Sequence, residues 1–426
     1  MPHPVGTKRT LAVFILAFVS AALPAHSGQK LPGFIVGESI SIGTEMAIQS
    51  AVYGRSRTVL VSVPEGYADG EKRYAVIYLT DASVKRLGLL RAIVDIMAGS
   101  QKIPDMIIVG IVQVDRNEEL TPGGLPGIGS EASGSESPPL RKGDRLLGFM
   151  KHELIPTIES RYRTLPSRIY VGHSRGGLFG VYCLLKDPAL FNAQIDVDPS
   201  IWWNDGALIA ALGAFLKGNP DVVHSLVVSE TREMERENGA YFVALKKVLE
   251  GGTNPFFRYG FMELAPAESH DSSVLPTLVH GLQVIFKDYS ELDFETLTLD
   301  GFRAHFAKPI LGAVYDLTEE MIDGFGQKKL MLKKYADAVA AFTENAQLHP
   351  NSAGAFYRLG EAYFRMEMLP ESLLNLEKAV ELGTRQHDPK LRTYISNRNT
   401  VRDLLGKKES PWPALAPAQP RSGVSP

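Results

Sequence analysis

The sequence predicts an α/β fold with a mostly parallel central sheet, followed by a small all-α domain. The chain has 426 residues, more than one domain usually contains, and 44% of them are hydrophobic, which is enough for a sizeable core. Segments with the strand pattern alternate with segments of helical period up to about residue 295. Beyond that point the strand pattern ends, and two similar helical segments follow each other at an offset of 34 residues.

Seven segments carry the β-branched and apolar side chains that favour strands. They are residues 58–63, 74–79, 106–112, 168–171, 193–197, 225–228 and 258–264. The continuous apolar run at 107–111 predicts burial on both faces, as in parallel sheets that are covered by helices. Such sheets bind ligands at the carboxyl ends of their strands. Residues 121–139, rich in Gly, Ser and Pro, predict a long surface loop.

A nucleophile motif follows the fourth of these strands. Residues 169–171 lead into Gly-His-Ser-Arg-Gly at 172–176, with Ser174 at its centre, and the apolar helical stretch 178–185 comes next. A strand, a tight turn and a helix form the context of a nucleophile elbow, in which glycines leave room for a strained serine. The helix directs its first amides at the same place, so the backbone N–H of Arg175 is predicted to stabilise an oxyanion. The motif thus predicts an α/β-hydrolase fold with Ser174 as nucleophile.

A serine hydroxyl needs a general base, which in this fold follows the last strand. His270 comes just after the strand at 258–264 and directly before a helix, so it is predicted to be that base. The acid of the triad is expected after the strand at 225–228, where Glu230 and Glu233 both qualify. The sequence does not choose between the two glutamates. The acid is expected to orient His270 and stabilise its imidazolium.

The sequence predicts no cofactor and no metal. It contains no His-Glu-x-x-His or Cys-x-x-Cys spacing, and no Gly-rich phosphate or dinucleotide loop follows the first strand. The one cysteine, Cys183, lies in the apolar stretch 178–185 and is predicted to be a buried packing residue. Lys and Arg total 45 against 48 Asp and Glu, without a block of like charge, which argues against a nucleic-acid partner. The predicted partner is a small-molecule ester.

Several motifs resemble, in order, the esterase family of α/β-hydrolases that includes S-formylglutathione hydrolase, mycolyltransferases and siderophore esterases of the enterobactin type. The resemblance covers roughly residues 50–289. It rests on residues 59–67, 78–81, 115–116 with 120–122, 172–191, 198–203 and 268–270. It implies that Ser174 and His270 are catalytic and that an acid near Glu233 completes the triad.

The same resemblance implies further site residues. The backbone at Asp81 or Ala82 would supply the second oxyanion donor, and Trp202 and Trp203 would line the substrate pocket, although we expect one of these two to be plain core packing. This chain has Asp81-Ala82 where the family commonly has Asp-Gly, which is a departure in the oxyanion loop. Arg175, beside the nucleophile, either meets an anionic group of the substrate or is a solvent-facing residue at the start of the helix.

The C-terminal segments resemble tetratricopeptide repeats over residues 319–383. Residues 335–348 and 369–382 carry apolar side chains at corresponding positions, and the amphipathic stretch 355–366 has small residues where helices approach closely. Such arrays usually need about three units to be stable, and about two are present, so we expect them to pack on the hydrolase domain. A protein partner is an alternative role for these repeats.

The N-terminus has the pattern of a secretory signal peptide. Lys8 and Arg9 precede an apolar stretch at 11–23 that is too short to span a bilayer, and small residues near Ala25 and Ser27 offer a cleavage point. We therefore expect a periplasmic or secreted protein without stable membrane insertion, with an uncleaved anchor as the alternative. The predicted parts are a signal peptide at 1–27, a hydrolase domain at 28–295, a linker at 296–315, helical repeats at 316–406 and a disordered tail at 407–426.

Taken together, the motifs predict an exported serine esterase that forms an acyl-enzyme, acting on a siderophore-type lactone or another small ester. Two alternatives stay open. An acyltransferase would use the same triad and differ only in the acceptor of the acyl group. A non-catalytic hydrolase-like scaffold would bind a protein through its helical repeats.

Overall fold

The computed structural model describes residues 41–123 and 142–409. The predicted signal peptide, most of the predicted surface loop at 121–139 and nearly all of the predicted tail lie outside these residues. No helix in the described part of the chain is long and apolar enough to cross a membrane.

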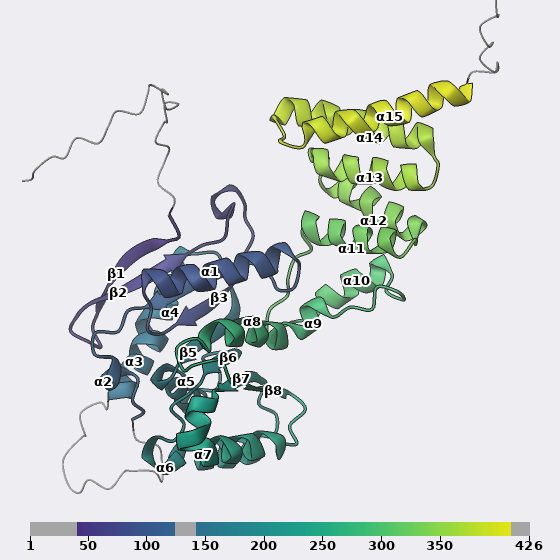
Figure 1. Ribbon diagram of the computed structural model, residues 1–426. Coiled ribbons are helices and arrows are strands. Elements are labelled where there is room, and N and C mark those ends of the chain that lie inside the picture. Colours follow the sequence, from purple (N-terminus) through teal and green to yellow (C-terminus); the bar gives the residue numbers. More distant parts are fainter. Residues whose placement is uncertain (1–40, 124–141, 410–426) are drawn as a thin grey trace, which may run out of the picture. The chain divides into compact units, whose positions relative to one another are not determined.

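An eight-stranded sheet forms the centre of the N-terminal part (Figure 1). The strands are β1 (Thr44–Ser50), β2 (Arg55–Ser62), β3 (Tyr74–Leu79), β4 (Met106–Ile111), β5 (Thr164–His173), β6 (Ala193–Val197), β7 (His224–Glu230) and β8 (Phe257–Glu263). Their order is β1-β2-β4-β3-β5-β6-β7-β8. The pairs β1–β2 and β2–β4 are antiparallel and the others are parallel, which confirms the predicted mostly parallel sheet. The sequence did not predict β1, an edge strand that is largely exposed.

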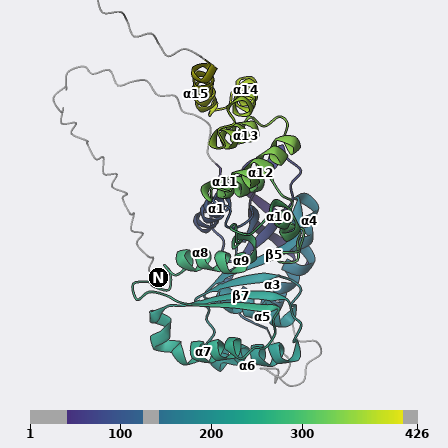
Figure 2. The same cartoon turned by 90° about the vertical axis from the view of Figure 1, so that its right-hand side faces the viewer.

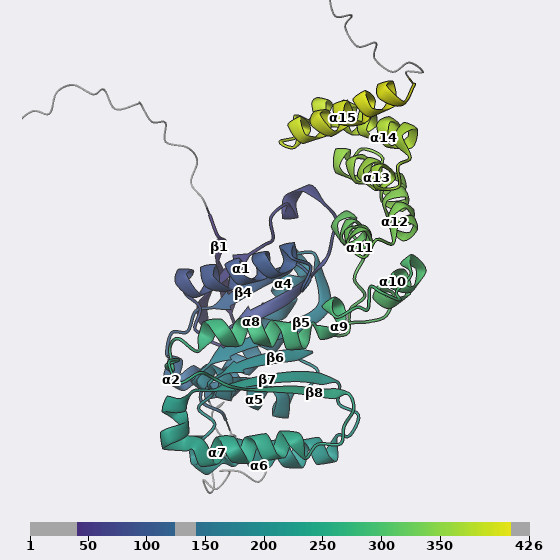
Figure 3. The same cartoon turned by 45° about the vertical axis from the view of Figure 1, so that its right-hand side comes forward.

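Helices cover both faces of the sheet, because side chains alternate between the faces along each buried strand. On β3, Tyr74, Val76 and Tyr78 pack into one apolar cluster, and Ala75 and Ile77 pack into the other. The first face is covered by α3 (Lys142–Phe149), a π-helical turn (Met150–Leu154), α4 (Ile155–Arg161), α5 (Arg175–Lys186), α6 (Trp203–Gly218) and α7 (Arg232–Glu250). The second is covered by α1 (Val84–Gly99) and α8 (Val274–Ile285), as Figures 2 and 3 show. The short α2 (Arg116–Glu119) follows β4.

The C-terminal part of the described chain is built from helices and the loops that connect them. It comprises α9 (Lys287–Ser290), α10 (Leu299–Phe306), α11 (Glu319–Met331), α12 (Tyr335–Leu348), α13 (Ala353–Arg365), α14 (Leu369–Gln386) and α15 (Leu391–Glu409). α13 and α14 begin 34 residues after α11 and α12, as the repeat in the sequence predicts. The predicted linker at 296–315 differs from expectation, because it contains α10, whose Phe302 and Phe306 are buried.

The helical part shares a core with the α/β part. Met321, Ile322 and Phe325 of α11 belong to the same apolar cluster as the residues of β3 and α8 on that face of the sheet. The hydroxyl of Tyr315 donates a hydrogen bond to Ser167 Oγ at 3.4 Å. The expectation that the helices pack on the α/β part is therefore confirmed.

A buried ion pair ties α2 to the sheet. Arg57 on β2 donates from Nη1 and Nη2 to the two carboxylate oxygens of Glu119 on α2, at 2.6 and 2.8 Å. The two side chains are 0% and 5% exposed, and the guanidinium also stacks on the Tyr53 ring at 4.1 Å. Bidentate geometry of this kind fixes both position and orientation. The pair therefore determines where α2 lies, at the carboxyl edge of the sheet.

We expect Glu119→Gln to lower the free energy of unfolding by about 3 kcal/mol, because it leaves the charge of Arg57 buried without a counter-ion. Urea denaturation followed by circular dichroism measures the change. The matched control is Glu377→Gln, which removes the exposed partner of Arg402 and should cost less than about 0.5 kcal/mol. Equal losses in both variants would contradict the structural role of the buried pair.

Candidate active site

Three neighbouring parallel strands end side by side at the candidate site. In the register of the sheet, Leu79 of β3 lies opposite Val171 of β5, and His173 of β5 lies opposite Val197 of β6. The residues just beyond these strands include Asp81, Ser174 and Asp198, and their φ angles are 55°, 60° and 42°. Positive φ strains a residue other than glycine and persists only where the surroundings enforce it. The three strained residues mark the carboxyl edge of the sheet as a functional site.

Ser174 occupies the tight turn between β5 and α5 that the sequence predicts. Its φ and ψ are 60° and −115°, and its N–H donates to the carbonyl oxygen of Val197 at 2.9 Å. A Cβ atom on Gly172 would lie 2.3 Å from the carbonyl carbon and oxygen of Gly176, so the turn can close only with glycine at position 172. These contacts hold the serine out of both the strand and the helix, as in a nucleophile elbow.

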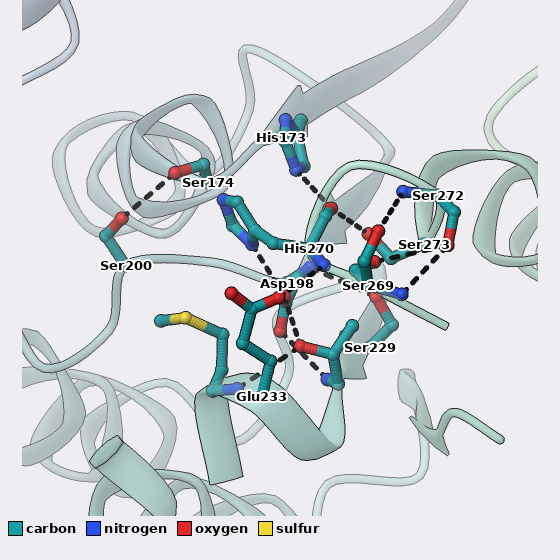
Figure 4. Close-up of polar contacts among 12 residues, drawn as sticks. His173, Ser174, Asp198, Ser200, Ser229, Glu233, Ser269, His270, Ser272 and Ser273 are labelled. Carbon is teal, nitrogen blue, oxygen red and sulfur yellow. Dashed lines mark hydrogen bonds and ion pairs between the residues drawn. The ribbon is translucent and has the colours of Figure 1, made fainter. Parts of the chain in front are cut away.

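The imidazole of His270 lies between Ser174 and Asp198 in Figure 4. Its Nδ1 is 2.7 Å from Oδ2 of Asp198. The Asp198 side chain is fully buried and also accepts hydrogen bonds from the N–H of Thr231 at 3.0 Å and from its hydroxyl at 2.7 Å. A carboxylate accepts all three bonds, so we assign the His270 proton to Nδ1. Nε2 is then left with a lone pair that can take a proton.

The hydroxyl of Ser174 has a second neighbour, Ser200. The two Oγ atoms are 3.3 Å apart, and the N–H of Ser200 donates to the carbonyl oxygen of Ser174 at 3.1 Å. Catalytic hydrogen bonds between serine and histidine often form only when substrate is bound. In Figure 4 the hydroxyl of Ser174 is directed at Ser200 rather than at the imidazole of His270.

His173 contacts the base through both its ring and its Nε2 atom. Its ring lies 4.4 Å from the ring of His270, measured between centroids, and its Nε2 is 2.9 Å from the carbonyl oxygen of His270. Its Nδ1 faces the Nη2 of Arg86 at 3.3 Å, which can only donate, so Nε2 carries the proton and donates to His270. Burial, followed by electrostatic repulsion from His270, lowers the pKa of His173 to about 4. A neutral His173 thus fixes the loop that carries the base.

The structure corrects the prediction of Glu230 or Glu233 as the acid, because the carboxylate on Nδ1 of His270 is that of Asp198. Glu233, on α7, accepts a hydrogen bond from the backbone N–H of His270 at 3.1 Å. Glu230 is the last residue of β7 and pairs with Glu263 on β8. The carboxylate on Nδ1 belongs to Asp198, one strand nearer to Ser174. The signal was present in the sequence, because Asp198 directly follows the apolar strand at 193–197.

The predicted oxyanion donors differ in availability. The N–H of Arg175 is the first of α5 and has no acceptor within the helix. The N–H of Asp81 donates to Oε1 of Gln113, a side chain that can move aside. The N–H of Ala82 donates to the backbone carbonyl of Ile111 at 3.0 Å, so Ala82 is engaged in the sheet edge. Of the two alternatives in this loop, the geometry favours Asp81.

The remaining site predictions concern tryptophans and metals. Trp203 is half-buried and packs against the apolar cluster of α6 and α7, in line with the expectation that one of the two tryptophans is core packing. Trp202 precedes α6 and is also half-buried, and its role in the pocket stays a prediction. Within the described residues, no group of three or more His, Cys, Asp or Glu side chains could hold a metal ion.

Part of the sequence is similar to known esterases. Residues 50–229 match the model of the family described as "Putative esterase". The chain is 33% identical over 91 residues to the siderophore triacetylfusarinine C esterase of Aspergillus fumigatus, covering 20% of this chain and 31% of that protein. It is 32% identical over 89 residues to the siderophore enterobactin esterase of Emericella nidulans, covering 20% of this chain and 29% of that protein. The chain thus spans less than a third of either esterase.

Solved structures share the fold. An IroE-like serine hydrolase from Shewanella oneidensis superposes with a TM-score of 0.55 at 23% identity, covering 68% of this chain and 95% of that one. An uncharacterised protein from Capnocytophaga ochracea superposes with a TM-score of 0.56 at 13% identity, covering 85% of this chain and 99% of that one. The family match and the two siderophore esterases support an ester hydrolase, and the structures support its α/β fold.

The contacts of His270 predict that replacing Asp198, Glu233 or Glu230 by its amide lowers kcat to different extents. Asp198→Asn should lower kcat for a 4-nitrophenyl ester by about 10³ to 10⁴-fold, because an amide on Nδ1 favours the tautomer that leaves no lone pair for Ser174. Glu233→Gln and Glu230→Gln should cost less than about tenfold, since the carboxylate on Nδ1 of His270 is that of Asp198. Steady-state kinetics measures the three values. A larger loss in Glu233→Gln than in Asp198→Asn would contradict the assignment.

The lowered pKa of His173 predicts a pH dependence of stability. The unfolded chain binds a proton at this ring near pH 6.5, whereas the folded chain does so only near pH 4, so stability is lost as the pH falls below 6.5. Between pH 7.5 and pH 5 this loss amounts to about 2 kcal/mol. His173→Gln keeps a donor for the His270 carbonyl and should remove that loss, as urea denaturation at the two pH values would show. An identical pH dependence in both proteins would refute the account.

Proposed function

We propose that the chain is an exported serine esterase that hydrolyses carboxylic esters through an acyl-enzyme, with Ser174 as nucleophile, His270 as base and Asp198 as the acid of the triad. The observation that carries the proposal is the strained Ser174 turn at the sheet edge, with the imidazole of His270 held by Asp198 beside it at 2.7 Å. The match of residues 50–229 to an esterase family supports the same chemistry.

In the first half of the reaction, Ser174 Oγ attacks the carbonyl carbon of the ester while its proton passes to Nε2 of His270. The imidazolium that forms is stabilised by the carboxylate of Asp198, which keeps its own charge throughout. His270 then gives the proton to the departing alcohol oxygen, and the acyl group stays on Ser174. The burial of Asp198 and its bonds from Thr231 hold the imidazole in place before the substrate arrives.

The negative charge that develops on the carbonyl oxygen needs preorganised donors. The N–H of Arg175 at the start of α5 is the first, supported by the positive end of the helix dipole. The N–H of Asp81 is the second, with the oxyanion replacing Oε1 of Gln113 as its acceptor. In the second half of the reaction water attacks the acyl carbon while His270 takes its proton, and His270 then returns that proton to Ser174 Oγ as the carboxylic acid leaves.

The substrate class, the location and the nature of the repeats belong to this proposal as well. The two similar siderophore esterases support a siderophore-type ester or another small ester as substrate. The charged and apolar pattern of residues 8–23 supports export. The 34-residue spacing of α11–α12 and α13–α14 supports tetratricopeptide-like repeats.

Ser174→Ala should abolish covalent labelling by an active-site-directed fluorophosphonate and lower kcat on short acyl esters by about 10⁴-fold or more, because the nucleophile is lost. Intact-protein mass spectrometry detects the label. The control is Ser160→Ala, which removes an exposed hydroxyl of α4 and should leave both readouts unchanged. Labelling or full turnover by Ser174→Ala would sink the proposed function.

A further inference from the structure

Three arginines converge on the turn that carries Ser174. Arg116 on α2 donates from Nη2 to the carbonyl oxygen of His173, the residue before the serine, at 3.2 Å. Arg86 on α1 contacts Nδ1 of the same histidine at 3.3 Å. Arg175 is the residue after the serine. Guanidinium groups stay charged at every physiological pH, so three positive charges gather here.

The described carboxylates that contact these arginines carry less charge than the arginines do. Asp81 lies 2.9 Å from Nε of Arg116 and 3.7 Å from Nη1 of Arg86, and its side chain is 9% exposed. Burial raises the pKa of the Asp81 carboxyl, and the two arginines oppose this shift. One carboxylate thus faces two guanidinium groups. The described contacts of the Asp198 carboxylate are with Thr231 and His270 rather than with these arginines.

Arg175 adds charge at an unfavourable position. It is the first residue of α5, where the helix dipole already presents a partial positive charge, and a cation there is destabilised. The described polar contact of its side chain is with a neutral group, the hydroxyl of Thr121, which accepts from Nη1 at 3.1 Å. An anion bound between this guanidinium and the helix start would remove the conflict.

Contacts with α2 hold the guanidinium groups of Arg116 and Arg175 in place. The Thr121 hydroxyl that accepts from Arg175 donates in turn to the carbonyl oxygen of Asn117, the neighbour of Arg116. α2 is itself fixed by the buried pair of Glu119 with Arg57. Arg116 keeps 38% of its side chain exposed. Preorganised cations at the turn that carries a nucleophile are suited to binding a charged group of the substrate.

We infer that Arg175 and Arg116 form a subsite for an anionic oxygen group of the substrate, such as a carboxylate, so that the enzyme selects esters with a negative charge close to the ester bond. Guanidinium groups recognise such oxygens through charge-assisted hydrogen bonds. The subsite rests on the proposed function, since it selects among esters that Ser174 would attack.

Two matched pairs of esters test the subsite. In the first pair, 4-nitrophenyl hexanoate and mono-4-nitrophenyl adipate differ by a carboxylate on the acyl side. In the second, phenyl acetate and 4-carboxyphenyl acetate differ by a carboxylate on the alcohol side. The readout is the ratio of kcat/KM for the charged ester to that for the neutral ester, in the full-length protein at low ionic strength, where charge effects are least screened.

In at least one pair, we expect Arg175→Gln to lower this ratio by about tenfold, the effect of one charge-assisted hydrogen bond. Arg175→Lys, which keeps the charge, should retain more of the ratio than Arg175→Gln. Arg402→Gln removes the same charge from α15, far along the chain, where Arg402 is 54% exposed and paired with Glu377, and should leave the ratio unchanged.

The outcomes separate the subsite from the chemistry. If the wild-type protein hydrolyses the neutral esters but Arg175→Gln leaves the ratio unchanged in both pairs, the subsite is rejected and the esterase stands. If the wild-type protein hydrolyses none of the four esters and also fails to react with a fluorophosphonate, the proposed function fails and the subsite fails with it. A ratio that falls equally in Arg402→Gln would also overturn the subsite, because the effect would then come from overall charge.

Discussion

The meeting of three parallel strand ends is the constraint on which the site depends. Because β3, β5 and β6 are neighbours in one sheet, the residues that leave them arrive at the same edge, and the hydrogen bond from the N–H of Ser174 to Val197 ties two of these ends together. The chain leaves these strands with Asp81, Ser174 and Asp198 in the positive-φ region. The apolar clusters on both faces of the sheet supply the stability that sustains this strain.

From this edge the polar groups extend as one connected set of contacts. Asp198 holds His270 by its ring, His173 holds it by its backbone carbonyl, and Glu233 holds it by its backbone N–H. On the other side of Ser174, Arg116 connects Asp81 to the carbonyl of His173. The base and the oxyanion loop are thereby both positioned through His173, the residue before the serine, because its ring contacts the carbonyl oxygen of His270 and its own carbonyl oxygen accepts from the Arg116 that binds Asp81.

The sequence predicted the strands of the parallel sheet and the positions of Ser174 and His270 because each carries a local signal. A continuous apolar run predicts a buried strand, and the glycines at 172 and 176 are required by a turn without room for a Cβ. The acid could not be predicted in the same way. Chain order favoured a carboxylate after β7, whereas which carboxylate reaches Nδ1 depends on how the loop carrying His270 crosses the sheet edge. Likewise, the edge strand β1 lacks the apolar run that reveals buried strands, and only pairing with β2 defines it.

The central claim is that Asp198, His270 and Ser174 act as one unit at this edge. A crystal structure of the protein after reaction with a fluorophosphonate tests it most directly, because the bound phosphonyl group mimics the tetrahedral intermediate. We predict a phosphonyl group on Ser174 Oγ, with one oxygen accepting from the N–H groups of Arg175 and Asp81, and Asp198 still on Nδ1 of His270. A label on another residue, or a Glu233 carboxylate on Nδ1 in place of Asp198, would contradict the account.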